Sequence, residues 1–92
     1  MNSMQNQTGA HKPYRTEKLT FAAYLVATGK AGLQGTEPNG QSKNVLFVLS
    51  HEPSQDEITA FFSGAAQVSA LRFAEAISTL KSAAYEARRV RR

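Results

Sequence analysis

In the short run Val45–Leu49, valine, leucine and phenylalanine follow one another without polar interruption. Such a run predicts a β-strand that is covered, at least in part, on both faces. Just upstream, Asn39-Gly40 is a dipeptide that favours a type I′ turn between two antiparallel strands. We therefore expect a hairpin that pairs residues 31–36 with residues 43–49.

One helix is predicted on each side of this hairpin. Residues 17–28 carry apolar side chains at helical spacing, and Thr16 is placed to act as the N-cap of this helix. Ser54 and Glu57 have the spacing of a capping box, in which each side chain binds the backbone N–H of the other residue. We therefore expect a second helix over residues 55–63.

A third, longer helix is predicted from about residue 70 into the high 80s. Its apolar positions recur at i, i+4, i+7 and i+11 and form one stripe, which consists of Phe73, Ile77, Leu80 and Ala84. The chain is therefore expected to be a small, single α+β domain in the order α-β-β-α-α. In this fold an antiparallel β-hairpin packs against helices.

The two ends of the chain differ in composition from its middle. Residues 1–15 are rich in Asn, Gln, Ser and Thr and hold too few apolar side chains to offset the entropy of ordering. We expect a flexible N-terminal arm over residues 1–15, an α+β domain over residues 16–87 and a basic C-terminal tail over residues 88–92. A core this small and a sheet with exposed edges both favour self-association or a protein partner.

Composition excludes several classes of protein. The chain has no cysteine, which excludes a disulfide scaffold, a thiolate metal site and a cysteine nucleophile. No apolar run approaches the roughly 20 residues needed to cross a bilayer, and the N-terminus lacks the apolar centre of a signal peptide. We therefore expect a cytoplasmic protein without a membrane partner.

The positive charge is concentrated at the C-terminal end. The formal net charge is +4, with 11 Lys and Arg against 7 Asp and Glu. Residues 21–80 carry a small acidic excess, whereas residues 81–92 hold five basic residues and one glutamate. Clustered arginines suit bidentate contact with phosphate, and Tyr85 lies one turn before Arg88, where its ring can stack on a base. The candidate nucleic-acid-binding residues are Lys81, Tyr85, Arg88, Arg89, Arg91 and Arg92.

No catalytic, cofactor-binding or metal-binding residues are predicted. Ser50-His51-Glu52 places three catalytic residue types in a row, but neighbours on an extended chain point to opposite sides and do not form a relay. We expect a polar loop where the strand ends. His11 and His51 are the two histidines, and no further ligands stand at metal-binding spacing. The chain is therefore expected to be non-enzymatic.

The order and spacing of packing and turn residues over residues 16–85 carry a family resemblance. The pattern is Thr16, Leu19-x-x-Ala22-Ala23-Tyr24-Leu25-x-x-x-Gly29, an Asn-Gly hairpin into Val45-Leu46-Phe47-Val48, Phe61-Phe62-x-Gly64, Val68 and Phe73-x-x-Ala76-x-x-x-Leu80-Lys81. This pattern resembles a family of small bacterial and phage proteins catalogued as a domain of unknown function. The resemblance implies a helix, a hairpin, a short helix and a longer C-terminal helix, and no functional residues. Gly32 and Gly35 depart from the apolar run usual in the first strand, and the terminal ARRVRR lies outside the resemblance.

Two functions remain open at this point. The first is a small accessory protein that binds DNA or RNA without sequence preference, through phosphate contacts of the C-terminal arginine cluster. The alternative is a protein–protein adaptor, or a subunit of a larger complex including a homodimer, in which the arginines have no nucleic-acid role. In the alternative, an apolar surface of the hairpin or the last helix recognises the partner.

Overall fold

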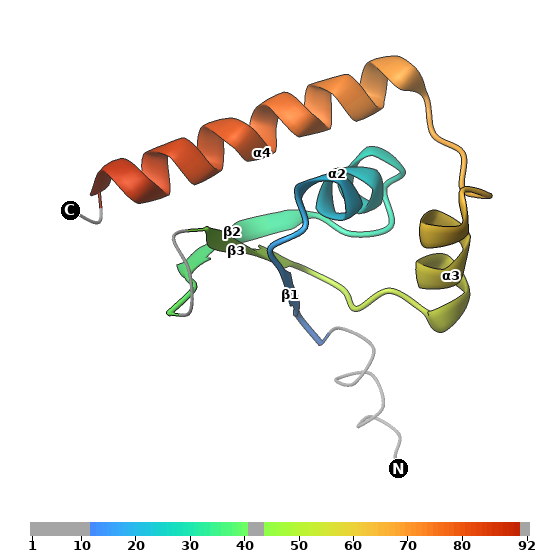
Figure 1. Cartoon of the computed structure of the whole chain (residues 1–92), viewed down its shortest axis with the longest axis horizontal. Helices are drawn as coiled ribbons and strands as arrows, with labels where there is room; N and C mark the ends of the chain where they lie inside the picture. Colours follow the sequence, from blue (N-terminus) through green and yellow to red (C-terminus); the bar gives the residue numbers. More distant parts are fainter. Residues whose placement is uncertain (1–11, 41–43, 91–92) are drawn as a thin grey trace, which may run out of the picture.

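The computed structural model describes residues 12–40 and 44–90. Along the chain the elements are β1 (Tyr14–Thr16), α2 (Leu19–Ala27), β2 (Leu33–Pro38), β3 (Val45–Leu49), α3 (Gln55–Ser63) and α4 (Ala70–Val90). The three strands form one antiparallel sheet in the order β1-β3-β2 (Figure 1). The α+β class and the predicted order of helix, two strands and two helices are confirmed, and one short strand precedes them.

β3 is the central strand of the sheet. Its register places Phe47 opposite Thr16 of β1. Val45, Phe47 and Leu49 belong to the main buried cluster and are at most 3% exposed. Because side chains alternate along a strand, Val48 projects to the opposite face, and it is buried as well. The prediction that both faces of this strand are partly covered is therefore confirmed.

An ion pair crosses the sheet on the face where Val48 lies. Arg15 of β1 donates from Nε to Oε1 of Glu37 on β2 at 2.8 Å, and from Nη2 to Oε2 at 3.1 Å. In the register Arg15 lies opposite Val48 and Glu37 lies opposite Leu46, so the pair links the two edge strands across β3. The hydrogen bonds donated by Arg15 hold the pKa of Glu37 below its ordinary value.

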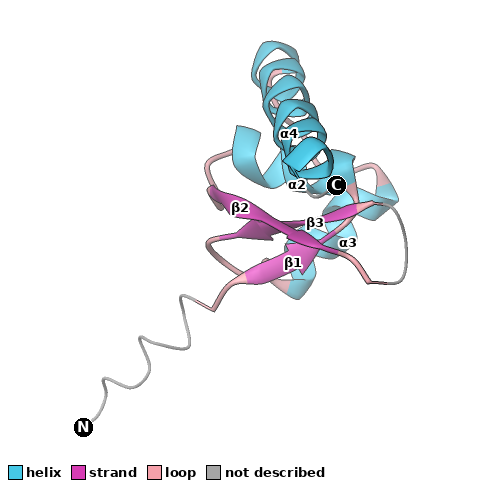
Figure 2. Cartoon of the chain, turned by 90° about the vertical axis from the view of Figure 1, so that its left-hand side faces the viewer, coloured by secondary structure: helices cyan, strands magenta, loops and turns pink. Residues whose placement is uncertain are grey.

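α2 and α4 form a layer on the other side of the sheet. Figure 2 shows α4 above the strands, with α2 beside it, and α4 contacts α2, β2 and β3. The largest fully buried side chains are Phe21 and Leu25 of α2, Leu49 of β3 and Leu80 of α4. Burial of each of these side chains contributes about 1.5–3 kcal/mol to the stability of the fold. Leu80 and Ala84 are both buried, as the predicted stripe of α4 requires.

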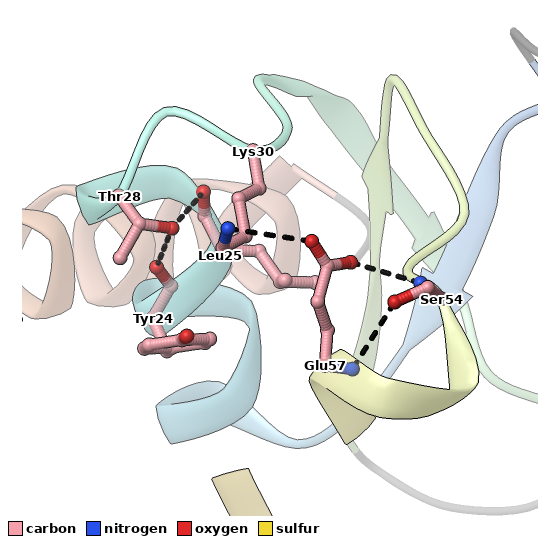
Figure 3. A network of polar contacts seen from close by, with 6 residues as sticks. All are labelled: Tyr24, Leu25, Thr28, Lys30, Ser54 and Glu57. Atoms are coloured by element: carbon pink, nitrogen blue, oxygen red, sulfur yellow. Dashed lines mark hydrogen bonds and ion pairs between the residues drawn. The ribbon is translucent and has the colours of Figure 1, made fainter. Parts of the chain in front are cut away.

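α3 is joined to the rest of the domain by polar and aromatic contacts. The predicted capping box is present: Ser54 Oγ accepts from the Glu57 N–H at 3.1 Å, and Glu57 Oε1 accepts from the Ser54 N–H at 2.8 Å. Glu57 Oε2 also lies 3.4 Å from Nζ of Lys30, which follows α2 (Figure 3). The Phe61 ring packs against that of Phe21, with centroids 5.0 Å apart. The predicted bounds of this helix are confirmed.

The prediction for the start of the folded domain is wrong. Residues 14–16 form β1, instead of ending an arm and capping a helix. Thr16 is buried in the sheet, and its Oγ1 accepts a hydrogen bond from the Lys18 N–H at 3.1 Å. Lys18 is therefore the N-cap of α2, without a side-chain capping bond, and the helix begins at Leu19. A strand of three residues is too short to show a hydrophobic period in the sequence.

The prediction for the hairpin turn is also wrong. A type I′ turn at Asn39-Gly40 needs positive φ at both residues. Among the residues that the structure describes, positive φ occurs only at two glycines elsewhere. β2 runs to Pro38 and β3 starts at Val45, so the connection is longer than two residues. β2 also begins later than predicted, at Leu33, where the register with β3 is irregular.

The chain ends are described only in part. The structure does not describe residues 1–11, so most of the predicted arm lies outside the described residues, together with His11, Arg91 and Arg92. α4 continues through Arg88 and Arg89 to Val90. These two arginines are therefore helical, although the sequence analysis placed them in a tail.

Candidate nucleic-acid interface

A groove of about 480 Å³ lies between the C-terminal half of α4 and the start of β3. Its floor is apolar and is formed by Leu19, Val45, Phe47 and Ala84. The last three are at most 6% exposed, because they also belong to the buried core. The floor is therefore fixed by the packing of α4 on the sheet.

Three of the predicted site residues line this groove. Lys81, Tyr85 and Arg88 come from one flank of α4, because positions i, i+4 and i+7 share one face of a helix. The Tyr85 side chain is 61% exposed, and both cations are exposed. The structure thus brings an aromatic ring between two positive charges at the mouth of an apolar groove.

The opposite flank of α4 has a different character. Arg72, Glu75 and Thr79 line a second concavity against α2. Nearer the C-terminus, Arg89 donates from Nη2 to Oε1 of Glu86 at 3.2 Å. Both glutamates of α4 are therefore kept away from the groove.

Arg89 lies apart from the groove, and its part in the predicted site stays a prediction. It is predicted together with Arg88, but it does not line the groove, and its side chain pairs with Glu86. Consecutive residues on a helix point about 100° apart, so one of two adjacent arginines faces away. Arg91 and Arg92 lie outside the described residues, and their part in the predicted site stays a prediction.

The sheet side of the groove adds two polar residues that the sequence analysis did not propose, Glu17 and Asn44. Glu17 Oε1 accepts hydrogen bonds from Nδ2 of Asn39 at 3.1 Å and from Nδ2 of Asn44 at 3.4 Å. The predicted helix over residues 17–28 would place Glu17 in its first turn, whereas Glu17 lies in the connection between β1 and α2. No local signal indicates this position, because it depends on pairing between β1 and β3.

The cations of the groove have no acidic partners in the part of the chain that the structure describes. The ion pairs found there join Arg15 to Glu37, Lys30 to Glu57 and Arg89 to Glu86. Lys81 and Arg88 are in none of them. Neither cation is therefore held in an ion pair within the described fold.

Ser50 and His51 are in contact, contrary to the expectation that neighbouring side chains would diverge. Ser50 Oγ lies 2.8 Å from Nδ1 of His51 and also accepts a hydrogen bond from the Gly32 N–H at 2.8 Å. The hydroxyl thereby joins the end of β3 to the residues before β2. Neither residue lines the groove or the concavity beside α2.

Residues 12–40 and 44–90 hold neither a metal-binding cluster nor a membrane-spanning helix. No three His, Cys, Asp or Glu side chains in these ranges lie together in a way that would hold a metal ion. No helix there combines the length and the apolar character needed to cross a membrane.

Comparison with known proteins adds no relative. No family model, curated protein or solved structure matches the chain. The family resemblance of residues 16–85 therefore stays a prediction.

Proposed function

We propose that the chain is a small, non-enzymatic, nucleic-acid-associated accessory protein that contacts phosphate through the C-terminal half of α4. The observation that carries this proposal is the pair Lys81 and Arg88, which flanks Tyr85 on one side of α4 without an acidic partner in the described fold. Phosphate contacts of this kind carry no sequence information, so the affinity that they supply is expected to be independent of base sequence.

The spacing of the two cations suits a nucleic-acid backbone. Arg88 lies seven positions after Lys81 in the helix, which corresponds to about 10.5 Å along the helix axis. A strand carries one phosphate per about 3.4 Å, so about three phosphates fit beside this length of α4. Two cations along one flank can therefore follow a backbone, with Arg88 able to bind a phosphate through two N–H groups.

Stabilisation of the helix end is the simplest competing explanation for these charges. Cations near a helix C-terminus interact favourably with the helix dipole, by about 0.3–1 kcal/mol within the last turn. This explanation covers Arg88 and Arg89 near Val90. It does not cover Lys81, which lies more than two turns earlier. The helix dipole also does not explain why both glutamates of α4 lie on the flank that faces away from the groove.

The proposal is tested by fluorescence anisotropy with labelled single- and double-stranded DNA and RNA at about 50 and 200 mM salt. We expect binding that weakens steeply with salt. Arg88→Gln should weaken binding and reduce the slope of log K against log salt by about 0.7 for a single strand. Arg72→Gln is the matched control, because it removes the same charge from the opposite flank of α4.

Two results contradict the proposal. Absence of binding to all four nucleic acids at the lower salt would remove it. Equal losses in Arg88→Gln and Arg72→Gln would show that only the net charge of the protein matters, and that the flank of α4 facing the groove has no special role.

A protein–protein adaptor is the second candidate function, and exposed apolar side chains favour it. Leu71 and Phe62 are 68% and 57% exposed, and β1 and β2 are edge strands of the sheet. Leu71 lies at the opposite end of α4 from Arg88, so the two functions are separable. If the adaptor function includes self-association, Leu71→Glu should shift a dimer to monomer in analytical ultracentrifugation while leaving nucleic-acid binding unchanged. A wild-type monomer at high concentration would contradict the homodimer.

A further inference from the structure

We propose that the groove beside α4 holds one unpaired nucleotide, whose base stacks on the ring of Tyr85 while Lys81 and Arg88 contact the neighbouring phosphates. This inference rests on the proposed function, and it names the substrate class as single-stranded nucleic acid. A base inside a duplex is stacked and paired, so only an unpaired base can enter the groove.

The dimensions and lining of the groove suit a nucleotide. Its volume of about 480 Å³ falls in the range of about 300–1,000 Å³ that is typical of small-molecule sites. Such sites combine a mainly apolar surface with a few polar groups that orient the ligand. Here the apolar floor lies between cations on α4 and Glu17 with Asn44 on the sheet side.

Tyr85 is the tyrosine whose ring is available for stacking. The Tyr14 ring packs edge-on against that of Phe21, and the ring centroids of Tyr24 and Phe61 are 5.3 Å apart. Tyr85 makes no ring contact with any residue that the structure describes, and it is 61% exposed. Proteins that bind single strands combine positive charges along the backbone with aromatic rings on which the bases stack, and Tyr85 beside Lys81 and Arg88 offers both.

The charges in the groove predict how the bound nucleotide is oriented. Glu17 repels phosphate, so the backbone is expected on the α4 side, near Lys81 and Arg88, with the base edge toward Glu17. Glu17 Oε1 accepts from two asparagine amides, whereas its Oε2 accepts no hydrogen bond from the described residues. A carboxylate oxygen can accept from the amino group of cytosine, adenine or guanine. Thymine carries a carbonyl oxygen where cytosine carries this amino group, so the groove favours cytosine over thymine.

The experiment compares strands that differ only in their bases. Anisotropy is measured at about 50 mM salt with oligo-dC, with an abasic strand of the same length and phosphate number, and with oligo-dT. Stacking of a base contributes about 1–3 kcal/mol, so oligo-dC should bind at least about fivefold more tightly than the abasic strand. Tyr85→Ala should remove this difference, while Tyr85→Phe, which keeps the ring, should retain it. Leu71→Ala, an exposed position on the same helix, is the control expected to change nothing.

Glu17→Gln tests the direction of the bound base. We expect the wild type to prefer oligo-dC to oligo-dT, and the variant to lose this preference while still preferring oligo-dC to the abasic strand. Circular dichroism of each variant establishes that the fold is retained, which is expected because Glu17 and Tyr85 are exposed.

The outcomes separate this inference from the proposed function. Equal affinity for oligo-dC and the abasic strand overturns the nucleotide site, while the phosphate-binding function stands. Equal affinity for oligo-dC, for the abasic strand and for a polyglutamate peptide of the same charge also overturns the nucleotide site. This result points to an acidic peptide as the ligand. Absence of binding to any strand overturns both proposals.

Discussion

Replacing Leu80 with alanine tests the packing of α4 on which the groove depends. The Leu80 side chain is fully buried and belongs to the same cluster as Phe21, Leu25 and Leu49. The substitution removes three buried carbon groups at about 0.8 kcal/mol each, about 2.4 kcal/mol. The cavity left behind raises the loss to about 3 kcal/mol or more. The free energy of unfolding of a domain of this size is about 4–12 kcal/mol, so the loss is a large share of the total stability.

Leu71→Ala is the matched control for this measurement. Leu71 lies on the same helix and undergoes the same chemical change, but it is 68% exposed. Its substitution should lower the free energy of unfolding by less than about 1 kcal/mol, since little area is lost and no cavity forms. The difference in helix propensity between leucine and alanine is at most about 0.7 kcal/mol, so it is small beside the loss expected for Leu80→Ala.

Urea denaturation followed by far-UV circular dichroism measures both effects. The free energy of unfolding of a small domain falls by about 1 kcal/mol for each 1 M of urea. Leu80→Ala should therefore lower the urea concentration at the midpoint of unfolding by about 3 M, and Leu71→Ala should lower it by less than about 1 M. A Leu80→Ala chain that is unfolded even without urea also agrees with the prediction. Equal, small shifts in both variants would refute the docking of α4 through Leu80, and the groove would then lose its floor.

Three further predictions concern local features of the fold. Arg15 holds the pKa of Glu37 below its ordinary value of about 4.3. Their pairing therefore stabilises the fold above that pH, and this stabilisation is lost as the pH falls through the lower pKa that Glu37 has in the folded state. Glu37→Gln should flatten the loss of stability below about pH 5, measured by urea denaturation at a series of pH values, and an unchanged pH profile would contradict this. Ser54→Ala removes the capping bond to α3 and should lower the free energy of unfolding by about 1 kcal/mol, measured by thermal denaturation. Gly64 ends α3 at a φ of 86° with nothing near the site of a Cβ, so Gly64→Ala should cost about 1–2 kcal/mol through backbone strain alone. Gly35→Ala, at a position equally open but without positive φ, should cost less, and equal losses would argue against the strain.

The helices of the C-terminal half were predictable because their signals are local. The capping box of α3 and the apolar stripe of α4 are each set by residues a few positions apart in the chain, and both are present. The strand β3 was predictable for the same reason, since a run of apolar strand-formers is recognisable without its partners. The charge asymmetry at the C-terminal end likewise identified Lys81, Tyr85 and Arg88, three of the residues that meet in the groove.

Local sequence signals are enough to predict the α+β class, the C-terminal helices and the cationic end of α4. Only the tertiary structure decided that β1 pairs with β3, that Thr16 lies in the sheet, and that Glu17 faces a groove with Arg88. The tertiary structure also divided the arginine cluster, by placing Arg88 at the groove and Arg89 beside Glu86. The physical reason is the range of the interactions: turns, caps and helical periods are fixed by near neighbours, whereas strand pairing and the meeting of distant side chains depend on packing the whole chain.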